Sequence, residues 1–111
     1  MKNLITFEDF SKVDIRIGTI IKVVDFPKAH KPAYQIHIDF GDLGTKKTSA
    51  QITSLYTKEE LLNKQVTAVV NFKVKQIANF WSECLLLGIK NGANVILLKS
   101  NEVLKNGEQI S

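Results

Sequence analysis

Apolar and polar residues alternate along this chain in short stretches, which is typical of β-strands separated by frequent turns. The clearest case is Tyr34, Ile36, Ile38 and Phe40, which alternate with polar side chains. This spacing puts the apolar side chains on one face of a half-buried strand. We predict further strands over residues 13–24, 46–52, 66–72, 83–89 and 95–98.

Two of these stretches depart from simple alternation. In residues 13–24 the alternation is lost beyond Gly18, and a glycine inside a strand followed by such a loss predicts a bulge or a sharp coil. The first strand of a small closed barrel needs such a bend, because it pairs on both sides. Residues 83–89 are apolar on both faces, which predicts a central strand.

Two short helices are predicted from capping signals. Thr6 begins a helix over residues 6–12, whose early acidic residues suit the positive end of a helix. Thr57 is followed by Glu60 at capping-box spacing, which predicts a helix running through Leu62.

The order of these elements predicts an all-β fold with short helices. Five main strands with a helix between the third and fourth are typical of the five-stranded Greek-key OB-fold barrel. The 111 residues suffice for a single domain, with the barrel core at about residues 13–90. The extensions at residues 1–12 and 91–111 are apolar on one side. They either cover an edge of their own barrel or form a homodimer interface.

The composition narrows the class of partner. Hydrophobic residues make up 44% and charged residues 23% of the chain, as in an ordinary soluble domain. A net charge of +4 permits a polyanionic partner without requiring one. Arg16 is the only arginine, and arginine is the usual reader of guanine edges in a duplex groove. The lysine-rich composition therefore argues against a reader of duplex DNA sequence and favours shape-directed phosphate contacts.

The single cysteine and the N-terminus bear on location. Cys84 cannot form an intrachain disulfide, which favours a reducing compartment, and its place in an apolar strand predicts an inert core residue. The N-terminus has no signal-peptide pattern, and no apolar run reaches the roughly 18 residues that a membrane span needs. We expect a cytoplasmic protein without membrane insertion.

The segment from Asn71 to Ile77 is the strongest candidate for ligand binding. Lys73 and Lys75 are one residue apart, so in an extended chain they project to the same side. There they would form a cationic ridge at the barrel mouth, where OB folds take oligonucleotides. The alternative is that both are solvated surface lysines.

Three further pairs of residues are candidates. Phe80 and Trp81 are adjacent aromatics, so one of them is a candidate stacking platform for a base or contact for an apolar peptide, unless this loop plugs the end of the barrel. Ser82 and Glu83 either hydrogen-bond a ligand or satisfy loop amides. Lys46 and Lys47 add charge on a strand that is otherwise read as a solvated edge.

No arrangement of residues predicts catalysis. His30 and His37 are the only histidines, and no Cys/His cluster occurs at metal-ligand spacing. The chain has no glycine-rich phosphate loop, and Ser82 has no convincing histidine partner in the sequence. We therefore predict no catalytic residues, no metal and no cofactor, and a protein that is not an enzyme.

Five segments in order resemble the tRNA-binding OB domain: Lys12–Gly18, Ser49–Ile52, Leu62–Val66, Val69–Lys73 and Ser82–Gly88. That domain is shared by bacterial stand-alone tRNA-binding proteins, the C-terminal extension of some methionyl-tRNA synthetases and endothelial monocyte-activating polypeptide. The resemblance implies an OB fold, a homodimer and tRNA binding by shape. Its CsaA-like members, which this chain resembles most, imply a chaperone-like role in protein export, with unfolded or precursor polypeptides and the export machinery as partners.

The resemblance also implies where RNA binds. In the family, the basic segment and the Ser-Glu region lie at the RNA face, which carries over to Asn71, Lys73, Lys75, Ser82 and Glu83. From their charge alone we add Lys46 and Lys47 to the predicted RNA-binding residues, and from their aromatic side chains we predict Phe80 and Trp81 as peptide contacts.

The chain departs from the family pattern close to these residues. Val74 stands where the family often has proline, Gln76 where it often has a cation, and Asn79 where it often has glycine. The missing cation at Gln76 weakens the basic ridge. This favours the alternative function, a polypeptide-binding chaperone with little RNA binding.

Overall fold

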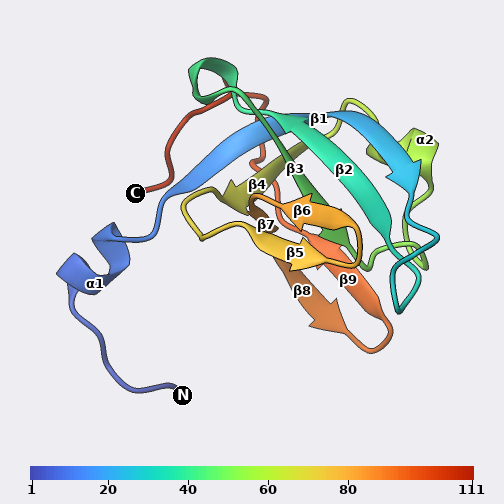
Figure 1. Cartoon of the computed structure of the whole chain (residues 1–111). Coiled ribbons are helices and arrows are strands. Elements are labelled where there is room, and N and C mark those ends of the chain that lie inside the picture. The colour runs from blue at the N-terminus through green and yellow to red at the C-terminus, as the bar shows by residue number, and fades with distance from the viewer.

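A computed structural model describes all residues, 1–111, and shows a nearly closed antiparallel barrel (Figure 1). Its sheet has the order β3-β2-β1-β4-β7. The strands are β1 (Ile15–Asp25), β2 (Tyr34–Asp39), β3 (Thr45–Ala50), β4 (Gln65–Val69) and β7 (Leu85–Leu86). Backbone bonding between Lys47 and Glu83 joins the two ends of the sheet. The predicted all-β fold with a five-stranded barrel is confirmed.

Strand β1 has the predicted bend. Its first half pairs with β4 and its second half with β2, and the register with β2 shifts between Ile20 and Lys22. Gly18 lies just before this shift, and a Cβ atom there would lie 2.6 Å from Cγ2 of Ile38. The absence of a side chain at residue 18 therefore lets β1 coil closely over β2.

The barrel interior is filled by the alternating apolar side chains of β2 and by residues from β1, β4 and α2. Ile36, Ile38 and Phe40 are fully buried. The helix α2 (Lys58–Leu61) packs Leu61 into the same core. Thr57 caps this helix with the predicted reciprocal bonds to Glu60.

The N-terminal extension stands away from the barrel (Figure 1). It contains α1 (Phe7–Ser11), which Thr6 caps as predicted and which buries no residue. Leu4, Ile5 and Phe7 are exposed, with 79% of Phe7 accessible. This extension therefore covers no edge of its own barrel.

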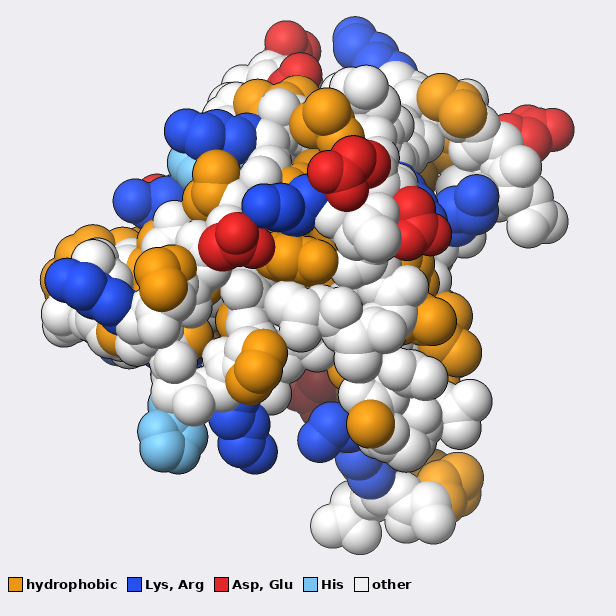
Figure 2. Space-filling model, turned by 90° about the vertical axis from the view of Figure 1, so that its right-hand side faces the viewer, with side chains coloured by type: hydrophobic (Ala, Val, Ile, Leu, Met, Phe, Trp, Pro, Cys, Tyr) orange, Lys and Arg blue, Asp and Glu red, His pale blue; other side chains and the backbone are white.

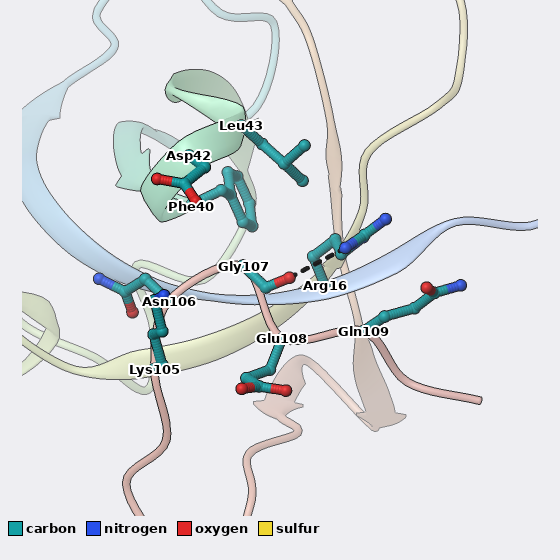
Figure 3. A pocket seen from close by; sticks show the side chains of 9 residues that line it. All are labelled: Arg16, Phe40, Asp42, Leu43, Lys105, Asn106, Gly107, Glu108 and Gln109. Atoms are coloured by element: carbon teal, nitrogen blue, oxygen red, sulfur yellow. Dashed lines mark hydrogen bonds between the residues drawn. The ribbon is translucent and has the colours of Figure 1, made fainter.

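The C-terminal extension, in contrast, runs along β1. The amides of Gly107 and Ile110 donate to the carbonyls of Ile17 and Ile15 at 2.7 and 2.9 Å. One guanidinium nitrogen of Arg16 donates to the Gly107 carbonyl at 3.0 Å, beside a hollow of about 360 Å³ next to the short 3-10 helix η1 (Gly41–Leu43) (Figure 3). The extension thus covers the part of the β1 edge that β2 leaves open.

The prediction of one central strand over residues 83–89 is wrong. Only β7 joins the sheet, and from Gly88 the chain forms a separate hairpin of β8 (Gly88–Asn91) and β9 (Asn94–Leu97). A Cβ atom at Gly88 would lie 2.8 Å from Cγ1 of Val95, so glycine permits the close approach of β9. The apolar run therefore serves two short elements in place of one long strand.

A second hairpin was not predicted. It consists of β5 (Lys75–Ile77) and β6 (Phe80–Ser82), with Ala78 in the turn at φ 54°. Glycine is the residue that usually adopts this left-handed conformation. Because alanine stands here, the sequence gives no turn signal between the two strands. None of the helices is long and apolar enough to cross a membrane.

Candidate nucleic-acid interface

A groove of about 560 Å³ lies between β3 and the β5–β6 hairpin. Three of the predicted RNA-binding residues, Lys73, Lys75 and Ser82, line this groove. The other lining residues are Thr48, Ser49, Phe72, Ile77, Cys84 and Leu85. Lys73 and Lys75 thus border the same hollow, as their spacing predicts.

The register of the hairpin decides which side chains face the groove. Lys75 lies opposite Ser82, and Ile77 lies opposite Phe80, so these four share one face of the hairpin. Trp81 lies opposite Gln76 on the other face. Trp81 is 51% exposed and does not line the groove. The hairpin therefore separates the two predicted ligand surfaces.

Phe80 is a packing residue. It is 5% exposed, and its ring centroid lies 5.4 Å from that of Phe26 in a small cluster that includes Ala33. This cluster holds the β1–β2 loop against the β5–β6 hairpin. Of the two aromatics predicted to contact peptide, only Trp81 is exposed.

The lysines of β3 lie on opposite faces of the strand. Lys46 pairs with Ile38, whose side chain points into the core. The charge of Lys46 lowers the pKa of the Cys84 thiol, against the larger effect of burial. Lys47 pairs with His37, and its Nζ lies 5.1 Å from the Phe80 ring centroid. Neither lysine is among the residues that line the groove.

Ser82 and Glu83 bond within the barrel wall. The Ser82 hydroxyl lies 3.0 Å from the Thr48 hydroxyl. The Lys47 amide donates to Oε1 of Glu83 at 3.0 Å. The Glu83 carboxylate thus satisfies a backbone amide of β3, while Ser82 bonds to a neighbouring hydroxyl, and both contacts fix the wall that β3 shares with the hairpin.

Asn71 also bonds to backbone. Its Oδ1 accepts from the Asp14 amide at 2.9 Å, and its Nδ2 donates to the Lys12 carbonyl at 2.7 Å. The side chain thus ties the end of β4 to the start of β1. It positions the strand end from which Lys73 and Lys75 extend.

Cys84 is a buried residue among those that line the groove. Burial raises the pKa of its thiol to about 12, so the thiol is uncharged at neutral pH. No group of three or more His, Cys, Asp or Glu side chains in the chain could hold a metal ion.

Sequence reasoning missed the apolar part of the groove. Phe72, Ile77 and Leu85 lie among its lining residues. One signal for it was available, because Ile77 continues the spacing of Lys73 and Lys75 by a further two residues. A groove lined by both apolar side chains and lysines can take a planar base and hold the attached phosphates.

The chain was compared with protein-family models, with curated proteins and with solved structures. A family model described as "Putative tRNA binding domain" matches residues 15–109. The chain belongs to this tRNA-binding domain family. The matched range contains the whole groove and the β5–β6 hairpin.

Two solved structures of CsaA chaperones match nearly the whole chain. The chaperone CsaA from Bacillus anthracis str. Ames is 46% identical with a TM-score of 0.93, and the match covers 98% of this chain and 100% of that one. The CsaA chaperone protein from Picrophilus torridus is 53% identical with a TM-score of 0.92, covering 97% and 100%.

The curated relatives are much longer proteins. Methionine–tRNA ligase from Pyrococcus horikoshii is 38% identical over 106 residues, and that from Thermococcus onnurineus is 35% identical over 106 residues. Each match covers 96% of this chain and 14% of the ligase. The chain therefore spans about one seventh of the length of these relatives.

Proposed function

We propose that the chain is a non-catalytic tRNA-binding protein of the CsaA type. In this proposal it holds tRNA by shape and phosphate contacts and acts as a chaperone connected with protein export. The observation that carries the tRNA part is that Lys73 and Lys75 border one groove within the range matched by the family model. The likeness to CsaA chaperones supports the chaperone part.

The chemistry of the groove suits a nucleic acid with unpaired bases. Its cations are lysines, which contact phosphates as point charges and lack the bidentate fork with which arginine reads guanine. The ring of Phe72 is 57% exposed and offers a surface for stacking. The side-chain hydroxyls of Thr48 and Ser82 bond to each other, so the groove presents few free groups for base reading. We therefore expect tRNA to be bound with little sequence preference.

The salt dependence of tRNA binding tests this proposal. Lys73→Ala combined with Lys75→Ala should reduce the slope of log K against log salt concentration by about one for each lysine. The matched control is Lys99→Ala with Lys105→Ala, which changes the charge equally but lies outside the groove. Equal slopes for wild type and the groove variant would count against the proposal.

A second candidate function is polypeptide binding with little RNA binding. The observation that favours it is the exposed indole of Trp81, which lies on the face of the hairpin opposite to Lys75. Trp81→Ser should weaken suppression of the aggregation of an unfolded client while leaving tRNA affinity unchanged. Unchanged suppression by this variant would remove Trp81 from the client site, and loss of tRNA affinity would show that the two surfaces overlap.

The proposed functional unit is a homodimer that works in the cytoplasm, where tRNA is found. The exposed side chains of Leu4, Ile5 and Phe7 support a dimer contact through the N-terminal extension, since they have no cover within the chain. Sedimentation should report a dimer for the wild type and a monomer for Phe7→Ser. A wild-type monomer at micromolar concentration would contradict this assembly.

A further inference from the structure

Three side chains form a basic row across the outer face of the sheet. His37 on β2 lies directly opposite Lys22 on β1 and Lys47 on β3. Directly opposite residues in antiparallel strands share one face of the sheet. The neighbours of His37 along β2, Ile36 and Ile38, are fully buried, so the row lies on the side turned away from the core. We call this the Lys22–His37–Lys47 row.

Two carboxylates lie close to the row. Glu83 raises the pKa of His37, but its Oε1 already accepts a hydrogen bond from the Lys47 amide. Asp39 shares the face two residues along β2, and its Oδ1 accepts the Gly41 amide at 2.8 Å. Neither Lys22 nor Lys47 forms an ion pair. The row thus has two lysine charges without a carboxylate partner, one on each side of a histidine, and the Lys47 ammonium also lies over the Phe80 ring.

The histidine is held in its neutral form in the free protein. Burial, Lys22 and Lys47 lower the pKa of His37, while Glu83 opposes them. Because the pKa lies below its ordinary value of about 6.5, the ring is uncharged at neutral pH. Figure 2 views the side of the molecule that carries α2 and shows Lys and Arg side chains scattered over it among hydrophobic and acidic ones.

A phosphate placed on this row would reverse the electrostatic balance. Its negative charge offsets the two lysines and favours the protonated ring, which can then donate a hydrogen bond to a phosphate oxygen. We propose that the Lys22–His37–Lys47 row binds a backbone phosphate of RNA and that His37 takes up a proton when it does so. This inference rests on the proposed tRNA binding and extends the binding surface from the groove onto the outer face of β1, β2 and β3.

Linkage fixes the direction of the pH effect. The pKa of His37 is lower in the free protein than in the complex, so the complex binds more protons in the interval between the two values. The affinity therefore rises as the pH falls through this interval. Above it the histidine contributes no pH dependence. One histidine can change the affinity by at most about tenfold for each pH unit.

The two histidines of the chain provide a matched pair of variants. tRNA binding is measured at constant ionic strength from about pH 7.5 to about pH 5.5, the range in which histidine titrates. The wild type and His30→Gln, altered in the exposed β1–β2 loop, should both bind about three- to tenfold more tightly at the lower pH. His37→Gln should lose this gain. A gain that persists in His37→Gln, or that disappears in His30→Gln, overturns the inference.

A measurement on the wild type alone guards against a folding defect in the variant. The ring resonances of His37, followed by NMR against pH, should give a higher pKa with tRNA bound than in the free protein. An unchanged pKa overturns the inference while leaving the groove proposal intact. If tRNA does not bind at any pH, the proposed function fails and this inference fails with it.

Discussion

Lys47 and Glu83 exchange two hydrogen bonds across the gap between β3 and the segment that joins β6 to β7. The Lys47 amide donates to Oε1 of Glu83 at 3.0 Å, and the Glu83 amide donates to the Lys47 carbonyl at 2.8 Å. These bonds close the barrel beside the groove. Glu83, which the family resemblance places at the RNA face, thus also helps to close the barrel.

Glu83→Ala should lower the free energy of unfolding by about 1–3 kcal/mol, because it leaves the half-buried Lys47 amide without an acceptor. Glu83→Gln keeps an acceptor oxygen and should lose less. Urea unfolding of the two variants and the wild type provides the measurement. If both substitutions cost the same, the side-chain bond to Lys47 is not the stabilising element.

Asn71→Ala should destabilise the protein by about 1–3 kcal/mol, since it removes the side-chain bonds to the Asp14 amide and the Lys12 carbonyl. Asn71→Asp retains only the acceptor and should fall between alanine and wild type. At a temperature where the variants are folded, the salt slope of tRNA binding should match that of the wild type. A reduced slope would show that Asn71 also organises phosphate contacts.

Gly18→Ala should destabilise the barrel by about 1–3 kcal/mol through overpacking. The new Cβ would lie 2.6 Å from Cγ2 of Ile38 and 2.7 Å from Cδ1 of Phe40, both fully buried side chains with no room to move. Thermal unfolding should show a clearly lower midpoint for the variant. An unchanged midpoint would mean that β1 can bend without a glycine at this position.

Cys84 should react slowly with thiol reagents in the folded protein. Its thiol has a pKa of about 12 in the fold against 9.0 for an unperturbed cysteine, so little thiolate forms near pH 8. Labelling should be fast in urea and slow in buffer. The folded state keeps the proton of the Cys84 thiol to a higher pH than the unfolded state does. The free energy of unfolding therefore falls as the pH rises above about 9. Rapid labelling of the native protein would contradict the buried position.

Local signals predicted much of the fold. Thr6 and Thr57 cap helices because each hydroxyl and its acidic partner act within one turn, which the sequence displays directly. The alternation in β2 and the bend after Gly18 are likewise properties of consecutive residues. These elements need no knowledge of the partner strand.

The elements that were mispredicted depend on contacts between distant residues. Ala78 turns the β5–β6 hairpin in a conformation that favours glycine, and Phe80 packs on Phe26, so the hairpin is held by tertiary packing. The apolar run leaves the sheet at Gly88, where the close approach of β9 requires a residue without a side chain. The register of the same hairpin brings Lys75, Ser82 and Ile77 onto one face, and this grouping could not be predicted because the hairpin itself was not.

The C-terminal segment along β1 has a consequence for the order of folding. Arg16 and Gly107 are 91 positions apart in the chain, yet they bond at the same edge of the barrel. While the chain is being synthesised, the start of β1 therefore keeps an open edge until residues 107–110 have emerged. An open strand edge invites pairing with other chains. Docking of residues 107–110 along β1 thus removes an edge at which the nascent domain could pair with other chains.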